Sequence, residues 1–192
     1  GDPRRDPETL YLLRRAMRLT PPQSPLLGRL FDLLARIRMD QRKFAEALQL
    51  HYFAVCLEDR DELIAQNLFY TARARGEAER ALELLQKRFK RFGAKSSQPA
   101  KTLYHALMQM EKYGDAFDVL NQAMKLRPKD GDILTYAADA HTHRGEFDEA
   151  EQILKKADGI SKPAARLRSM AYLAINRDQR SVARDLYAEI LK

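Results

Sequence analysis

Apolar residues recur along this chain at spacings of three and four residues, with charged and polar residues between them. On a helix, such spacings bring the apolar side chains to one face, which can then be buried. β-Branched residues are rare, which disfavours a sheet. The pattern therefore predicts an all-α protein in which a lone helix precedes five helix pairs: 6–18, then 28–39 with 43–56, 62–75 with 78–91, 97–111 with 114–126, 131–143 with 147–157, and 164–176 with 180–192.

Alanine recurs once in the second helix of each predicted pair. The positions lie 34, 35, 34 and 33 residues apart and are Ala47, Ala81, Ala116, Ala150 and Ala183. A small residue allows two antiparallel helices to approach closely, and a larger apolar residue can then fill the space between neighbouring hairpins. We expect that filling role for the residue four positions further on, which is Leu85, Leu120, Leu154 or Tyr187. A helix pair repeated at this period predicts an α-solenoid of antiparallel helix hairpins.

Glycine and proline mark the expected turns. Gly76, Gly114 and Gly145 lie between paired helices, where we expect each to adopt the left-handed backbone that glycine tolerates best. Pro128 and Pro163 follow the expected second helices of two hairpins, because a helix cannot continue through proline.

These features resemble the tetratricopeptide repeat family, whose pattern combines small residues, an aromatic residue and a terminal proline. Two central repeats carry that pattern in Tyr113, Ala116, Ala123 and Pro128, and then in Ala138, Phe147, Ala150 and Ala157. Arg88 and Ile190 depart from it, since each stands where a small residue is expected.

The resemblance implies a right-handed superhelix that forms a single array over residues 1–192. A half repeat and linker at 6–27 are followed by repeats at 28–61, 62–96, 97–130, 131–163 and 164–192. Because this array starts in mid-repeat, we expect the chain to be a piece of a longer solenoid, or its ends to be covered by another subunit.

In this family the first helices of the pairs line an inner groove that binds partner proteins. The corresponding positions here are rich in aromatic, basic and amide side chains, which combine contact area with directional hydrogen bonds. The resemblance implies a partner-binding groove made of Arg29, Arg36, Asn67, Tyr70, Arg73, Lys101, His105, Gln109, Tyr136, Asp139 and Tyr172. Polar positions on a solvated helix face, or aromatic residues half-buried between repeats, would give the same composition.

The net charge of +7 and the pI near 9.5 indicate acidic partners, or a solvated basic surface. We expect the partner to be another protein, through an acidic segment or as an enzyme subunit, and we expect no small-molecule substrate. The sequence has no run of about 18 apolar residues, so contact with a membrane would come only from parts outside this segment.

No residues suggest catalysis, a cofactor or a metal. The glycines are scattered singly, and His141 and His143 lie two apart on a helix, so they point in different directions. We interpret Cys56 as a small buried hydrophobic residue. The basic run from Lys87 to Phe92 could bind phosphates, but a helix C-terminus with Phe89 and Phe92 packed inward accounts for it better.

The sequence thus predicts a non-enzymatic scaffold for protein–protein interaction. Long bacterial solenoids of this kind are similar to the scaffold arms of exopolysaccharide export systems, which implies recruitment of a polymer-modifying enzyme and a periplasmic location. Otherwise we expect a cytoplasmic protein. The alternatives are an RNA-binding helical repeat, which Asp132 and Asp139 disfavour by repelling phosphate, and the regulatory arm of an enzyme outside this segment.

Overall fold

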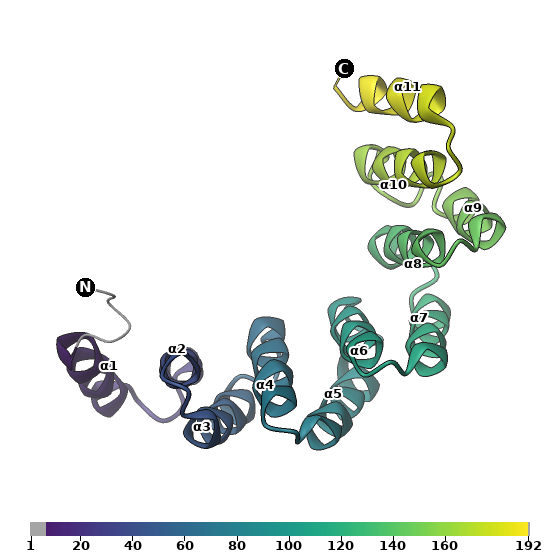
Figure 1. Ribbon diagram of the computed structural model, residues 1–192. Coiled ribbons are helices and arrows are strands. Elements are labelled where there is room, and N and C mark those ends of the chain that lie inside the picture. Colours follow the sequence, from purple (N-terminus) through teal and green to yellow (C-terminus); the bar gives the residue numbers. More distant parts are fainter. Residues whose placement is uncertain (1–6, 192) are drawn as a thin grey trace. The chain divides into compact units, whose positions relative to one another are not determined.

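A computed structural model describes residues 7–191, which contain eleven helices and no strand. Figure 1 shows the helices in chain order. Their bounds are α1 Pro7–Leu19, α2 Pro25–Asp40, α3 Phe44–Leu57, α4 Glu62–Ala74, α5 Ala78–Phe92, α6 Gln98–Gln109, α7 Tyr113–Leu126, α8 Gly131–His143, α9 Phe147–Lys156, α10 Pro163–Asn176 and α11 Arg180–Ile190. The predicted all-α fold of helix hairpins is confirmed; residues 6 and 192 of the predicted helices lie outside the described residues.

Side chains cap three of the described helices, and one of these caps explains why α2 starts earlier than predicted. Helix α2 begins three residues before the predicted start because the Ser24 hydroxyl caps it, accepting a hydrogen bond of 3.3 Å from the Leu26 N–H, and Pro25 fits the first helical position. Asp61 caps α4 through hydrogen bonds from Leu63 and Ile64 of 3.0 and 3.2 Å. Asp130 caps α8 in the same way.

The chain divides into two compact units, which we describe one at a time. Of the described residues, unit 1 holds 7–92 and 101–112, and unit 2 holds 93–100 and 113–191. In unit 1, α2 packs against α3, α4 packs against α5, and α1 covers α2 through Leu13, which meets Leu34 and Ile37. In unit 2, α8 pairs with α9, and α10 pairs with α11. The prediction of one continuous array with the boundaries given above stays a prediction.

The alanine ladder lies in the core between the helices. Ala47, Ala81, Ala116 and Ala150 are fully buried, and Ala183 is 4% exposed. The larger residues Leu85, Leu120 and Leu154 are buried as expected, because neighbouring helices pack over them. For Tyr187 the expectation is wrong: its side chain is 42% exposed, since no described helix packs over that face of α11.

One residue in each of five turns adopts the left-handed backbone. Gly76 and Gly145 do so, with φ of 80° and 79°. The expectation for Gly114 is wrong, because Gly114 lies inside α7 and Glu111 takes the left-handed position with φ 59°. Arg42 and Asp178 occupy the equivalent positions with the same φ of 59°.

The same pair of hydrogen bonds closes all five turns. In the first of them, the Lys43 N–H donates to the Arg38 carbonyl at 2.8 Å and the Arg42 N–H donates to the Met39 carbonyl at 2.9 Å. This is the Schellman ending of a helix, which requires one residue at positive φ. Each left-handed residue precedes the ladder alanine by five positions, so the turn geometry fixes where the second helix starts.

Two other expectations, for Pro163 and Cys56, need correction. Pro163 does not end α9, which stops at Lys156. It is instead the first residue of α10, a position at which a backbone N–H makes no hydrogen bond within the helix, so proline loses none there. Cys56 is exposed rather than buried, because it lies two residues after the buried Ala54 and so points away from the core. Tyr113, the expected aromatic of one repeat, is 52% exposed.

Candidate functional site

In unit 1 the predicted groove residues lie on three helices. Helix α2 carries Arg29 and Arg36, α4 carries Asn67, Tyr70 and Arg73, and α6 carries Lys101, His105 and Gln109. These are the first helices of their hairpins in the sequence prediction. Two hollows open on them, and Tyr70 lines both.

The first hollow has a volume of about 430 Å³ and lies mainly between α2 and α4. Its apolar wall comes from Leu33, Ile37 and Met39, while Arg36 and Asn67 contribute polar groups. Thr9 of α1 and the buried His51 of α3 also reach it. A hollow of this size and composition is suited to an apolar side chain of a bound segment.

The second hollow is smaller, about 220 Å³, and lies between α4 and α6. Tyr70, His105 and Gln109 are predicted groove residues in its wall, which also includes Gln66 and Thr102. Together the two hollows form what we call the unit 1 groove, and Tyr70, 47% exposed, stands between them. Five predicted residues line it: Arg36, Asn67, Tyr70, His105 and Gln109.

A buried polar cluster supports the first hollow. Asp32, 5% exposed, accepts a hydrogen bond of 2.9 Å from the Asn67 amide, and its carboxylate lies 3.3 Å from His51 Nε2. The other ring nitrogen of His51 shares a hydrogen bond of 2.9 Å with the Thr71 hydroxyl. This chain of contacts holds the Asn67 side chain in place at the edge of the hollow.

The charges around Asp32 also determine its ionisation. Burial alone would raise the pKa of the Asp32 carboxyl, but the contacts with His51 and Asn67 and the charges of His51 and Arg36 lower it below the ordinary value. Asp32 therefore stays ionised at neutral pH and balances the charge of Arg36, whose Nε lies 3.3 Å away. The sequence prediction did not include His51, although a histidine within the apolar run of α3 was a signal for such a cluster.

The remaining predicted residues of unit 1 lie beside the groove. Arg29 is exposed and pairs with Asp61 at 3.8 Å. The Arg73 guanidinium donates a hydrogen bond of 3.0 Å to Gln109, whose amide in turn donates to the Tyr70 hydroxyl at 3.3 Å. Lys101 lies one helical turn before His105. Burial of His105 lowers the pKa of its imidazole, and the nearby positive charge of Lys101 lowers it further. Both effects favour the neutral form of His105 at pH 7.

In unit 2 the predicted residues are less clearly brought together. Tyr136 and Asp139 lie three positions apart on α8, and Tyr172 lies on α10, which packs against α8. All three side chains are half-buried. Two hollows of unit 2 are lined by other residues, so the predicted groove in this unit stays a prediction.

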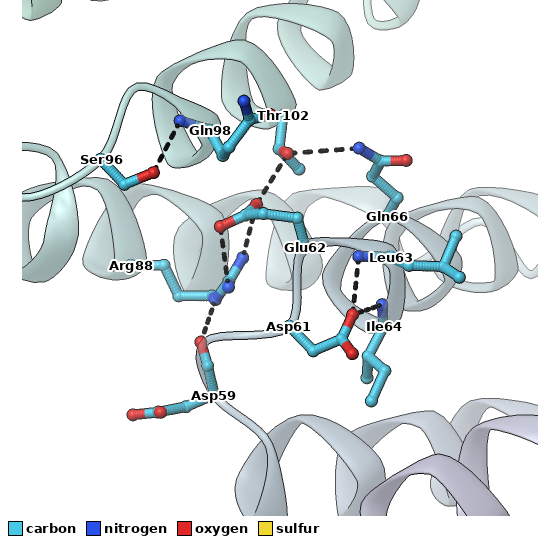
Figure 2. A network of polar contacts seen from close by, with 10 residues as sticks. All are labelled: Asp59, Asp61, Glu62, Leu63, Ile64, Gln66, Arg88, Ser96, Gln98 and Thr102. Carbon is cyan, nitrogen blue, oxygen red and sulfur yellow. Dashed lines mark hydrogen bonds and ion pairs between the residues drawn. The ribbon is translucent and has the colours of Figure 1, made fainter.

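Arg88 forms a second polar network in unit 1, shown in Figure 2. Its guanidinium donates two hydrogen bonds to the Glu62 carboxylate, at 3.1 and 3.2 Å, and a third of 2.8 Å to the Asp59 carbonyl. The Thr102 hydroxyl donates to Glu62 at 2.8 Å and accepts a hydrogen bond of 3.4 Å from Gln66, a residue of the second hollow. The network therefore fixes the start of α4 relative to α5 and α6.

The other chemical features of the sequence have structural roles. Phe89 and Phe92 of the basic run are buried as expected. His141 packs against Phe117, with ring centroids 4.9 Å apart, and contacts Glu146 at 2.7 Å, whereas His143 is exposed. Among residues 7–191, no group of three or more His, Cys, Asp or Glu side chains is arranged to hold a metal ion. Over the same residues, no helix is both long and apolar enough to span a membrane.

Comparison with known proteins agrees with this architecture. Residues 107–170 match the family model described as tetratricopeptide repeat. Residues 107–170 of the chain therefore carry tetratricopeptide repeats. Repeats of this family are in general non-catalytic and bind other proteins, which supports a protein-interaction scaffold in that general sense. No curated protein matches the sequence.

Several solved structures share the fold at low sequence identity. PilF from Pseudomonas aeruginosa is 18% identical with a TM-score of 0.54, over 95% of this chain and 82% of that one. A MamA protein is 18% identical with a TM-score of 0.50, over 85% and 90% of the two chains. MamA from Desulfovibrio magneticus RS-1 is 14% identical with a TM-score of 0.51, over 85% and 93%. At these identities the similarity establishes the fold alone.

Proposed function

We propose that this tetratricopeptide repeat protein is a non-catalytic scaffold that binds an extended segment of a partner protein in the unit 1 groove. The observation that supports this most directly is the position of Tyr70. Its half-exposed ring lines both hollows, so one bound segment could contact the ring and place side chains on either side of it. Tyrosine offers a large contact area at a small entropic cost, which makes it a frequent anchor in protein interfaces.

The groove favours a segment with both apolar and polar side chains. Leu33, Ile37 and Met39 offer apolar contact in the first hollow. The amides of Asn67 and Gln109 are already oriented by hydrogen bonds to Asp32 and Arg73, so little side-chain entropy would be lost when they bind a peptide backbone.

The charges indicate where an acidic residue of the partner would bind. Arg73 is exposed and donates to the neutral Gln109, so that contact leaves its positive charge uncompensated. We therefore place an acidic residue of the partner next to Arg73, at the edge of the second hollow. Arg29 and Arg36, in contrast, already contact the carboxylates of Asp61 and Asp32. This compensation disfavours the RNA-binding alternative, which needs arginines available for phosphates.

Site-specific photocrosslinking in a lysate of the source organism tests the proposal. A photoreactive amino acid at Leu33, in the first hollow, should crosslink a partner protein, whereas the same group at Phe53, an exposed position of α3 outside both hollows, should not. Tyr70→Ala should lower the affinity for that partner about tenfold or more, as expected for an interface anchor. Equal crosslinking from both positions would reject the unit 1 groove as the binding site.

Tyr113→Ala is the matched control for Tyr70→Ala. Tyr113 is exposed to a similar degree but lies on α7 of unit 2, so its loss should leave the affinity unchanged. If both variants bind the partner as the parent does, partner binding does not depend on this groove. The identity of the crosslinked protein also tests the narrower prediction of an exopolysaccharide-modifying enzyme, and recovery of RNA alone would favour the nucleic-acid alternative.

A further inference from the structure

Unit 2 contains a hollow that the proposed function does not use. It has a volume of about 770 Å³ and lies between α7 and α9; we call it the α7–α9 hollow. Asp118 and Lys125 line it from α7, Ile153 and Lys156 from α9, and Ile160 from the turn after α9. Both helices are second helices of their predicted hairpins, so this surface is not the one that the family resemblance selects.

The base of the hollow is apolar. Leu134 of α8 and Ile153 are 3% and 7% exposed, and Met124 is half-buried beside them. Ile160 contributes further apolar surface that is 40% exposed. A hollow with these walls favours the burial of an apolar side chain, at about 25 cal/mol for each Å² removed from water.

Two lysines stand at the C-terminal ends of the helices that border the hollow. Lys125 is the last residue but one of α7, and Lys156 is the last residue of α9. Within residues 7–191, neither lysine forms an ion pair. A lysine at a helix C-terminus is favoured by the helix dipole alone, so the charges by themselves do not define a binding site. Here, however, both lysines line the same hollow as Ile160 and the apolar base.

We propose that the α7–α9 hollow binds a short acidic–apolar segment of a partner protein. An apolar side chain of the segment enters the hollow against Ile160 and Ile153, and neighbouring Asp or Glu residues contact Lys125 and Lys156. The inference concerns a different surface from the unit 1 groove and does not depend on it. A nucleic acid fits less well, because it would place phosphates near Asp118 and would leave the apolar base without a matching group.

Selection from a display library of random dodecapeptides tests this proposal. The target is the full chain with Tyr70→Ala, which weakens the unit 1 groove, and selection is carried out at low salt. We expect the recovered peptides to share an apolar residue flanked by Asp or Glu. Ile160→Glu should lower the affinity of these peptides about tenfold, because it puts a carboxylate against the apolar side chain and the acidic flanks.

Charge reversal gives the sharper result. Lys125→Glu with Lys156→Glu should lower the affinity for the acidic peptides about tenfold and should select basic–apolar peptides from the same library. Lys87→Glu with Lys90→Glu, which makes the same charge change at exposed positions of α5, should leave both the affinity and the selected sequences unchanged.

Two outcomes would overturn the proposal. Peptides enriched in Asp and Glu but without a shared apolar residue would mean that the surface attracts anions without using the hollow. Equal effects of the two double variants would mean that only net charge matters. Circular dichroism of each variant would verify that the exposed substitutions leave the helices intact.

Discussion

Glu111 occupies a backbone position that suits glycine better. It adopts φ 59° in the same kind of turn in which Gly76 and Gly145 adopt φ near 80°. The left-handed conformation costs a residue with a Cβ atom about 1 kcal/mol or more. We therefore expect Glu111→Gly to raise the free energy of unfolding by about 0.5–1 kcal/mol, since some of the gain is lost to the greater freedom of glycine in the unfolded chain. Urea denaturation followed by circular dichroism would measure the change.

The reverse substitution is the control. A Cβ atom at Gly145 would meet nothing within 4 Å, so Gly145→Ala adds backbone strain without a steric clash. We expect it to lower the free energy of unfolding by about 1 kcal/mol. If Gly145→Ala were neutral, the left-handed position would not carry the strain on which the Glu111 prediction rests.

At the scale of elements, Arg88 connects α5 to the start of α4. It stands where three other repeats have Ala54, Ala123 and Ala157, and its side chain reaches Glu62 and the Asp59 carbonyl. Arg88→Ala would leave the Glu62 carboxylate without its cation and the carbonyl without its donor. We expect a loss of about 2 kcal/mol in the free energy of unfolding, measured by denaturant titration.

A double-mutant cycle separates this interaction from simple packing. Glu62→Gln removes the charge that Arg88 balances, so Arg88→Ala should cost about 1 kcal/mol less in the Glu62→Gln background. If alanine were better at this position because it restores the family pattern, Arg88→Ala would instead be neutral or stabilising in both backgrounds.

The helices could be predicted from the sequence because the alanines from Ala47 to Ala183 recur at a regular spacing. That spacing gives the length of the repeat, and the alanines mark the buried face of each second helix. The pattern also identified Arg88 as a departure, but not its partner Glu62, which lies 26 residues away without any sequence signal. In α3 the pattern failed for Cys56, because nearly every residue there is apolar and periodicity cannot select the buried face.

The candidate site was predictable only in part. Family positions pointed to Tyr70, His105 and Gln109, which line one hollow. The Asp32–His51 contact below the first hollow could not be predicted, because it joins two helices and depends on their packing. The α7–α9 hollow was missed because it lies on second helices, which the family resemblance does not associate with binding.

At the scale of the whole molecule, a repeat protein is stabilised mainly by contacts between neighbouring repeats. A core substitution should therefore weaken the hairpins around it more than distant ones. Leu154, 4% exposed in α9, and Leu68, fully buried in α4, provide a matched pair in the two units. Each Leu→Ala change should lower stability by about 3 kcal/mol, from lost burial and the cavity left behind.

Amide hydrogen exchange would show how far each loss spreads along the chain. Leu154→Ala should accelerate exchange chiefly in α8, α9 and α10, and Leu68→Ala chiefly in α3, α4 and α5, because these helices pack against one another and exchange reports local opening. Equal acceleration throughout residues 7–191 in both variants would mean that the described chain unfolds as one cooperative body. The two proposed binding surfaces could then not respond separately, and a ligand in the unit 1 groove would stabilise the α7–α9 hollow as strongly as its own helices.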